Sequence, residues 1–151
     1  MKILMVCLGN ICRSPLAEGI MQKMINDHNL PWEVDSAGTG AWHIGESPDP
    51  RSQKVAMQNG LDISHQRARQ FHAGDFDTFD YIIVMDSSNY RNVSQLARNE
   101  ADMEKVELIM NFVQPGYNQA VPDPYYAQDG FGEVYEMLIE ACDAFIKTVT
   151  S

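Results

Sequence analysis

A cysteine and an arginine with five residues between them, Cys7 and Arg13, stand near the start of the chain in the segment V-C-L-G-N-I-C-R-S-P. In a loop of this size that closes onto a helix, successive backbone N–H groups can point at one centre and bind an anion. The same positive surroundings favour a thiolate on Cys7, and the Arg13 guanidinium offers two parallel donors to phosphate oxygens. These residue types predict a nucleophile that attacks phosphorus and forms a phosphocysteine.

The residues inside this segment suit a tightly curled loop. Gly9 and Asn10 are residue types that accept a positive φ, and Ser14 followed by Pro15 is a typical helix start. The spacing by itself is weak evidence, because a cysteine and an arginine also occur at this distance by chance. Buried cysteines at strand ends are common in proteins as well. The predicted phosphate loop consists of Leu8, Gly9, Asn10, Ile11, Cys12, Arg13 and Ser14.

Cleavage of a phosphate monoester also needs a proton for the leaving oxygen. Far along the chain, Asp123 stands before Pro124 and two aromatic residues, Tyr125 and Tyr126. An Asp-Pro pair alone usually marks a turn. Beside a phosphate loop, however, Asp123 is a candidate to protonate the leaving group and then to activate water against the phosphocysteine.

Short apolar runs that alternate with longer amphipathic stretches predict an α/β fold, with a four-stranded parallel sheet and helices on both faces. The phosphate loop would follow the first strand, and the ends of the strands would meet at one crevice. Strands are predicted at residues 2–7, 32–36, 81–85 and 106–110. Helices are predicted at about residues 15–29, 50–59 and 131–149, and another follows a capping sequence at residues 86–88 and reaches about residue 98; residues 111–129 are mostly a loop.

Length and composition limit the possible functions. The 151 residues, of which 44% are hydrophobic and 21% charged, predict one globular domain spanning residues 1–151. A net charge of -10 argues against nucleic-acid binding, which needs a basic face. The acidity is concentrated in residues 99–151, so residues 1–98 can still accept an anion. No apolar run is long enough for a membrane span or a secretory signal, so we expect a cytoplasmic protein.

The chain resembles the low-molecular-weight protein-tyrosine phosphatases over its whole length. Several segments in the same order carry the resemblance, from the phosphate loop to the Asp-Pro-Tyr-Tyr run. They are residues 6–15 (V-C-L-G-N-I-C-R-S-P), 35–39 (D-S-A-G-T), 42–43 (W-H), 48–51 (P-D-P-R), 68–70 (A-R-Q), 79–81 (F-D-Y), 85–86 (M-D) and 123–126 (D-P-Y-Y).

The resemblance implies roles for the matching residues. Cys7 would be the nucleophile, Arg13 the phosphate clamp and Asp123 the general acid and base. Ser14 would donate to the Cys7 thiolate, and Asn10, Ser36 and His65 would complete a network that supports the loop. For His65 an ordinary surface position remains an alternative, and Asp86 fits either a supporting acid or a helix cap.

The family's substrate slot implies phosphotyrosine on a protein, or a small aryl phosphate, as substrate. Trp42, Tyr125 and Tyr126 would be its walls, although Trp42 could instead pack in the core. Tyr126 matches a position that is phosphorylated in some family members. No metal or other cofactor is implied, and we expect a monomer or a weak homodimer.

The other cysteines separate into two kinds. Cys12 matches the family's redox partner, which forms a reversible disulfide with the nucleophile and protects it; packing is the alternative. Cys142 is predicted to face the core from the last helix.

Two other functions compete with a phosphatase. A thioredoxin-coupled arsenate reductase shares the opening motif but relays a disulfide through later cysteines, and this chain has none between Cys12 and Cys142. A phosphocysteine carrier or an inactive phosphate reader would not need Cys7, Arg13 and Asp123 together.

Overall fold

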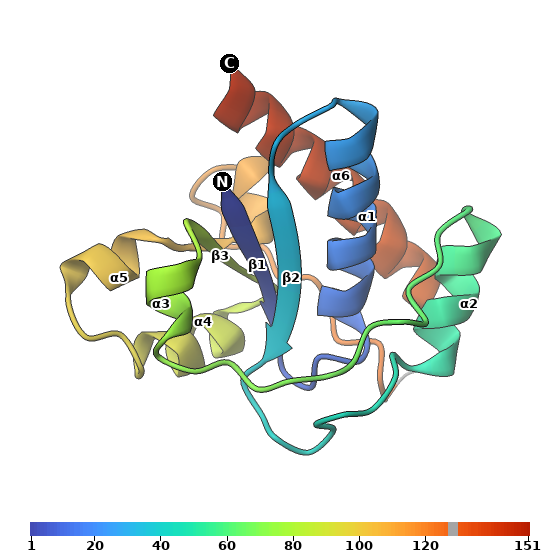
Figure 1. Ribbon diagram of the computed structural model, residues 1–151, viewed down its shortest axis with the longest axis horizontal. Coiled ribbons are helices and arrows are strands. Elements are labelled where there is room, and N and C mark those ends of the chain that lie inside the picture. Colours follow the sequence, from blue (N-terminus) through green and yellow to red (C-terminus); the bar gives the residue numbers. More distant parts are fainter. Residues whose placement is uncertain (127–129) are drawn as a thin grey trace.

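Four parallel strands form the centre of the fold in a computed structural model that describes residues 1–126 and 130–151 (Figure 1). The sheet has the order β2-β1-β3-β4, so the first strand of the chain lies inside it. The strands are β1 (Lys2–Cys7), β2 (Glu33–Gly38), β3 (Tyr81–Val84) and β4 (Val106–Leu108). The predicted α/β class and the four-stranded parallel sheet are confirmed.

Helices connect the strands and cover both faces of the sheet (Figure 1). They are α1 (Arg13–Asp27), α2 (Pro50–Gln58), α3 (Asp75–Thr78), α4 (Ser87–Ser94), α5 (Glu100–Glu104), the short 3-10 helix η1 (Ile109–Phe112) and α6 (Phe131–Thr150).

Several boundaries differ from the sequence prediction by one or two residues, as in β2, predicted at 32–36, and β3, predicted to end at residue 85. Two larger differences have a cause in the local structure. The helix predicted to reach residue 98 ends at Ser94, and α5 begins after Asn99, whose side chain accepts a hydrogen bond from the Asp102 N–H. This cap pairs an N–H group in the first turn of α5, so a new helix begins there and is separate from α4. The fourth strand ends at Leu108 because the chain turns there into η1.

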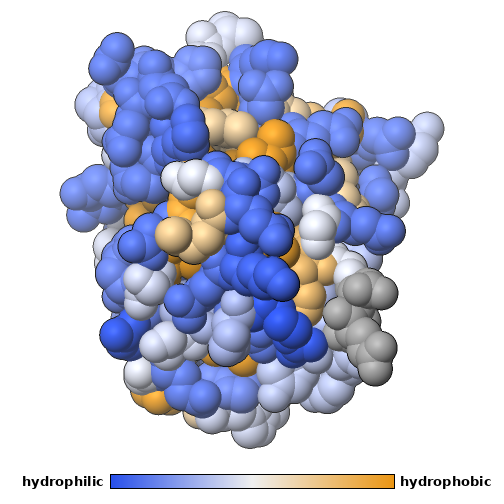
Figure 2. All heavy atoms as spheres, turned by 90° about the vertical axis from the view of Figure 1, so that its right-hand side faces the viewer, coloured by the Kyte–Doolittle hydropathy of each residue, from blue (hydrophilic) through white to orange (hydrophobic). Residues whose placement is uncertain are grey.

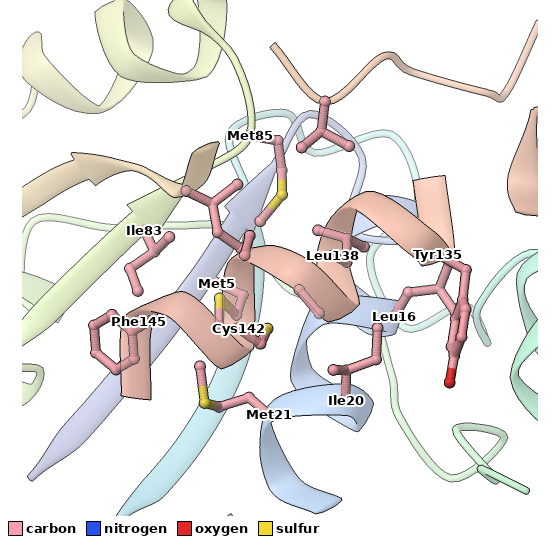
Figure 3. Packing of buried hydrophobic residues seen from close by; sticks show 14 of the residues in the cluster. Met5, Leu16, Ile20, Met21, Ile83, Met85, Tyr135, Leu138, Cys142 and Phe145 are labelled. Carbon is pink, nitrogen blue, oxygen red and sulfur yellow. The ribbon is translucent and has the colours of Figure 1, made fainter. Parts of the chain in front are cut away.

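Alternate residues of β1 point to opposite faces of the sheet, as expected for a strand. Ile3 and Met5 pack against α1 and α6, while Leu4 and Val6 pack on the other side, with Phe76 from α3. Figure 3 shows the first of these two clusters, in which side chains from β1, β3, α1 and α6 point toward one another.

The two long helices bury the apolar faces that their sequences predict. In α1, Leu16, Ile20 and Ile25 are buried as expected, but Met21 takes the buried position expected for Met24, which is only partly covered. All of the α6 positions predicted to face inward are buried: Val134, Leu138, Ala141, Cys142 and Phe145.

The face that carries α2 is mostly hydrophilic, and its apolar residues lie in small separate groups (Figure 2). Among residues 1–126 and 130–151, no helix is both long enough and apolar enough to cross a membrane.

Candidate active site

Residues 8–14, the phosphate loop, connect the carboxyl end of β1 to α1. The backbone N–H groups of residues 8–12 donate to no acceptor within the described parts of the chain, whereas carbonyls on the outside of the loop are paired. Unpaired N–H groups at the start of a helix form an anion-binding nest. The paired carbonyls are those of Cys7 and Leu8, which accept from Thr39 and Gly40 at 2.9 Å, and of Ile11, which accepts from Asp49 at 2.8 Å.

Local backbone geometry explains two of the residue types around the loop. Asn10 adopts the left-handed conformation with a φ of 58°, as predicted. Gly38 of β2 approaches the loop so closely that a Cβ atom there would lie 2.7 Å from the Leu8 carbonyl oxygen. The positive φ expected at Gly9 is wrong; a Cβ atom at Gly9 would instead lie 3.1 Å from Cδ2 of His43.

A chain of hydrogen bonds runs from the Cys7 thiol to a carboxylate on α1. Cys7 Sγ lies 3.0 Å from Ser14 Oγ, and Asn10 Nδ2 donates to Ser14 Oγ at 2.8 Å and to Ser36 Oγ at 3.0 Å. Ser36 Oγ then donates to Glu18 Oε1 at 2.7 Å. Asn10 Oδ1 also accepts from the backbone N–H of residue 69 at 3.0 Å, so the side chain of Asn10 holds the loop against the interior of the protein.

His65 lies outside this network, contrary to the expectation from the resemblance. Its side chain is exposed, and within the described residues no hydrogen bond joins it to the network. Glu18 occupies the end of the network instead. Burial, with a smaller contribution from Asp35, raises the Glu18 pKa to about 7, although Ser36 and Arg69 favour the carboxylate.

Arg13 is buried and joins three parts of the molecule. Its Nη1 donates to Asp86 Oδ2 at 2.6 Å and to the Val121 carbonyl at 2.8 Å, and its Nη2 lies 3.6 Å from Asp123 Oδ2. Burial opposes the charge, but Cys7, Asp86 and Asp123 together raise the Arg13 pKa above its ordinary value. Asp86 also caps α4 through the N–H of residue 89, so both of the roles considered for it are present.

A cavity of about 240 Å³ opens above the phosphate loop. Cys7, Arg13 and Asp123 line it together, so residues more than a hundred positions apart in the sequence meet there. Its aromatic lining comes from Trp42, His43, Tyr125 and Tyr126. Trp42 is 71% exposed and Tyr126 is 86% exposed, so Trp42 belongs to the rim of this cavity and not to the core.

The model of the low molecular weight phosphotyrosine protein phosphatase family matches residues 2–151. The chain belongs to this family. It is 42% identical over 152 residues to the Schizosaccharomyces pombe phosphatase of that name, with 98% of this chain and 96% of the relative covered. It is 41% identical over 150 residues to the Homo sapiens protein, with 97% and 94% covered.

Solved structures agree with the sequence comparison. The protein tyrosine phosphatase from Entamoeba histolytica superposes with a TM-score of 0.92 at 38% identity and covers 99% of this chain and 97% of its own. The present chain is accordingly a cysteine-dependent phosphotyrosine protein phosphatase.

The phosphatase keeps its other two cysteines away from solvent. Cys12 is buried in the phosphate loop, where burial, followed by Asp49, Cys7 and Asp123, raises its pKa to about 12. Cys142 is completely buried on α6, and burial raises its pKa to about 12 as well. The prediction that Cys142 belongs to the core is confirmed, and this position leaves no surface thiol for an arsenate-reductase relay.

Two residues of the phosphatase site were missed from the sequence. Glu18 follows Ser14 by four positions, so both lie on one face of the helix. A lone acidic residue at that position, beside buried apolar residues, was the signal that could have identified it. His43 lies in the cavity with Nδ1 2.8 Å from Glu46 Oε2. An imidazole directly after Trp42, with an acid three positions later, was its signal.

Proposed function

We propose that the phosphatase transfers the phosphoryl group of phosphotyrosine to Cys7 and then to water. The Cys7 thiolate attacks phosphorus while Asp123 gives its proton to the phenolic oxygen, so the bond from that oxygen to phosphorus breaks as the bond to sulfur forms. Asp123 then removes a proton from water, which attacks the phosphocysteine and releases inorganic phosphate and the thiolate. The observation that carries this proposal is the single cavity lined by Cys7, Arg13 and Asp123.

Arg13 and the phosphate loop would hold the charge that develops on phosphorus. Within the described residues the N–H groups of residues 8–12 donate to no acceptor, and Asp86 holds the Arg13 guanidinium in place, so both can supply the donors that electrostatic stabilisation of a transition state requires. Ser14 Oγ lies 3.0 Å from Cys7 Sγ, close enough to donate to the thiolate when it leaves phosphorus in the second step.

Asn10, Ser14 and Ser36 would support the loop in its curled form. The left-handed backbone at Asn10 is less favourable than an ordinary one, and its side chain compensates through bonds to both serines. We assign the end of this network to Glu18 in place of His65, because Glu18 accepts the Ser36 hydroxyl at 2.7 Å.

The walls of the cavity favour a flat aromatic ester. Trp42 and Tyr125 lie at its mouth, and the Tyr125 and Tyr126 rings pack edge to face with centroids 4.9 Å apart. Aromatic walls gain contact area from an aryl group that a short alkyl group does not offer. We therefore propose phosphotyrosine on a protein, or a small aryl phosphate, as substrate.

Cys12 is our candidate for the redox partner of Cys7. Both cysteines line the cavity, and the buried Cys12 thiol would condense with a Cys7 sulfenic acid, formed by a peroxide, to give a disulfide and water. The cytoplasmic location and the monomeric or weakly dimeric state expected from the sequence remain part of the proposal.

Leaving groups of different acidity test the acid role. Asp123→Ala should lower kcat/KM for a phosphotyrosine peptide by about 100-fold or more, and for para-nitrophenyl phosphate by much less, because a more acidic phenol leaves without a proton. Cys7→Ser should abolish turnover of both substrates. Equal losses on the two substrates in Asp123→Ala would contradict the assignment.

A further inference from the structure

The first turn of α2 lies between the phosphate loop and the segment that carries Asp123, residues 121–126, which we call the acid loop. On one side, the Asp49 N–H donates to the Ile11 carbonyl at 2.8 Å, and Ser52 Oγ donates to the Cys12 carbonyl at 3.3 Å. On the other side, Arg51 Nη2 donates to the Tyr125 carbonyl at 3.0 Å. One helical turn thus connects both halves of the site.

The Arg51 guanidinium is itself held in place. Asp49, which caps α2 and is 8% exposed, accepts from Nε and Nη2 of Arg51 at 3.0 Å each. The guanidinium carbon also lies 4.6 Å from the centroid of the Phe131 ring. A two-pronged ion pair that stacks on an aromatic ring restricts rotation of the side chain, so Arg51 presents its donors in a defined direction.

The peptide group of Tyr125 connects Arg51 to Asp123. While its carbonyl accepts from Arg51, the Tyr125 N–H donates to Asp123 Oδ1 at 3.0 Å. Movement of the Tyr125 backbone would therefore move the carboxylate that is to protonate the leaving group.

Arg13 also restrains the acid loop, and the phosphate group of a substrate would compete for the same N–H donors. Arg13 donates to the Val121 carbonyl at 2.8 Å and lies 3.6 Å from the Asp123 carboxylate. A phosphate bound in the loop attracts the same guanidinium donors. Arg51 is not part of the cavity lining, so its hydrogen bond to Tyr125 is not exposed to that competition.

We propose that Arg51 is a positioning residue that keeps Asp123 within reach of the leaving oxygen while substrate engages Arg13. This inference rests on the proposed function, in which Asp123 is the general acid. A misplacement of a catalytic group by about 1 Å can lower a rate by roughly 100-fold. The loss of Arg51 should therefore lower kcat/KM most for a substrate whose leaving oxygen must be protonated.

The test compares kcat/KM of Arg51→Ala for a phosphotyrosine peptide and for para-nitrophenyl phosphate. We expect a loss of about 10- to 100-fold for the peptide and of less than about threefold for the nitrophenyl ester. Arg51→Lys, which keeps the charge but not the fork of donors, should lie between wild type and Arg51→Ala. Arg67→Ala is the matched control, because Arg67 also donates to backbone carbonyls, but only to those of Ser64 and Gln66 beside it.

A double variant separates positioning from a general effect on the fold. If Arg51 acts through the acid, Arg51→Ala should change peptide turnover less than about threefold when Asp123 is already alanine. Equal losses on both substrates, or a full loss in the Asp123→Ala background, would overturn the inference. It would also be overturned if Arg51→Ala did not fold and Arg51→Lys lost both activities equally.

Failure of the inference can be told from failure of the proposed function. If Asp123→Ala shows the leaving-group dependence and Arg51→Ala does not, only the role of Arg51 is wrong. If Asp123→Ala itself shows none, the acid assignment is wrong, and the inference is overturned with it.

Discussion

The phosphate loop and the acid loop meet in one cavity but are held by opposite means. In the phosphate loop Asn10, Arg13 and Ser14 are all buried, and the bonds of their side chains run into the protein. In the acid loop Asp123 and Tyr126 are exposed. Within residues 1–126 and 130–151, three hydrogen bonds join the acid loop to the rest of the protein: Val121 N–H to the Met85 carbonyl, Arg13 to the Val121 carbonyl and Arg51 to the Tyr125 carbonyl.

This difference matches what each loop has to do. Stabilisation of charge on phosphorus depends on donors that are oriented in advance, so a rigid, buried loop serves it. A proton donor has to reach the leaving oxygen of a substrate that enters from solvent. The acid loop is exposed and has few restraints, so it can accommodate substrates at this position. Arg13 belongs to the phosphate loop and donates a hydrogen bond to the acid loop. A substitution of Arg13 therefore breaks a connection between the two loops.

Among the variants that compare the two loops, Arg13→Lys should have the largest effect, because one ammonium group cannot reproduce the planar guanidinium, whose Nη1 donates to both Asp86 and Val121. We expect kcat/KM for para-nitrophenyl phosphate to fall by about 100- to 1,000-fold. Steady-state kinetics, with the exposed Arg91→Lys as control, measure this. Retention of activity to within about threefold would show that the fork is not needed.

Asn10→Ala should make the phosphate loop as loosely held as the acid loop. It removes donations to Ser14 and Ser36 and leaves an alanine at a φ of 58°. We expect a loss of about 2 to 4 kcal/mol in the free energy of unfolding and of at least about tenfold in kcat/KM. Urea unfolding and steady-state kinetics measure the two losses.

Asn118→Ala is a matched control for that variant. Asn118 also has a positive φ, of 54°, and its side chain accepts from Asn111 Nδ2 at 3.0 Å, but it precedes the acid loop. It should lower stability while kcat/KM changes less than about threefold, because none of its bonds reaches the phosphate loop. Equal losses of activity in the two variants would remove the distinction between the loops.

Glu18→Gln should have a smaller effect, which depends on pH. The Glu18 pKa rises from an ordinary value of 4.5 to about 7 in the folded protein, so folding disfavours the carboxylate. Below about pH 4.5 the Glu18 carboxyl group does not lower the free energy of unfolding. As the pH rises toward 7 it lowers the free energy of unfolding by a growing amount, and above pH 7 this loss reaches its full size. Glutamine stays neutral and can still accept from Ser36, so the variant should gain roughly 3 kcal/mol relative to wild type between pH 4.5 and pH 8.

Chemical unfolding at both pH values measures this gain, and the exposed Glu140→Gln on α6 serves as control. A constant difference between Glu18→Gln and wild type across this range would show that Glu18 does not titrate there. Asp35 and Arg69 are the charged groups that act on Glu18, so their variants should shift the transition in opposite directions.

The sequence predicted most of the fold because the strands and long helices follow local apolar patterns. The first strand was predicted with its observed bounds, since its buried run ends where the loop begins. The break between α4 and α5 was missed because Asn99 signals a cap only through its bond to residue 102. The short helix α3 was missed as well, since four residues carry no periodic pattern.

The site was predictable where residues act through their own chemistry and less so where they act through neighbours. Cys7, Arg13 and Asp123 carry recognisable reactive groups, and the structure brings them together. Glu18 and His65 are both titratable, but only the fold decides that Glu18 meets Ser36 and that His65 faces solvent. The spacing of Glu18 from Ser14 suggests a shared helix face, but it does not predict the contact with Ser36, which lies on another element.

Every step of the proposed reaction depends on Cys7, which carries the phosphoryl group from the tyrosine to water. Rapid acid quench of the wild type during turnover of a phosphotyrosine peptide, followed by mass spectrometry of the digested protein, detects this intermediate. We predict a phosphate on the peptide that contains Cys7, which accumulates and decays with turnover and is missing in Cys7→Ser. Phosphate on another residue, or continued hydrolysis by Cys7→Ser, would contradict this role of Cys7.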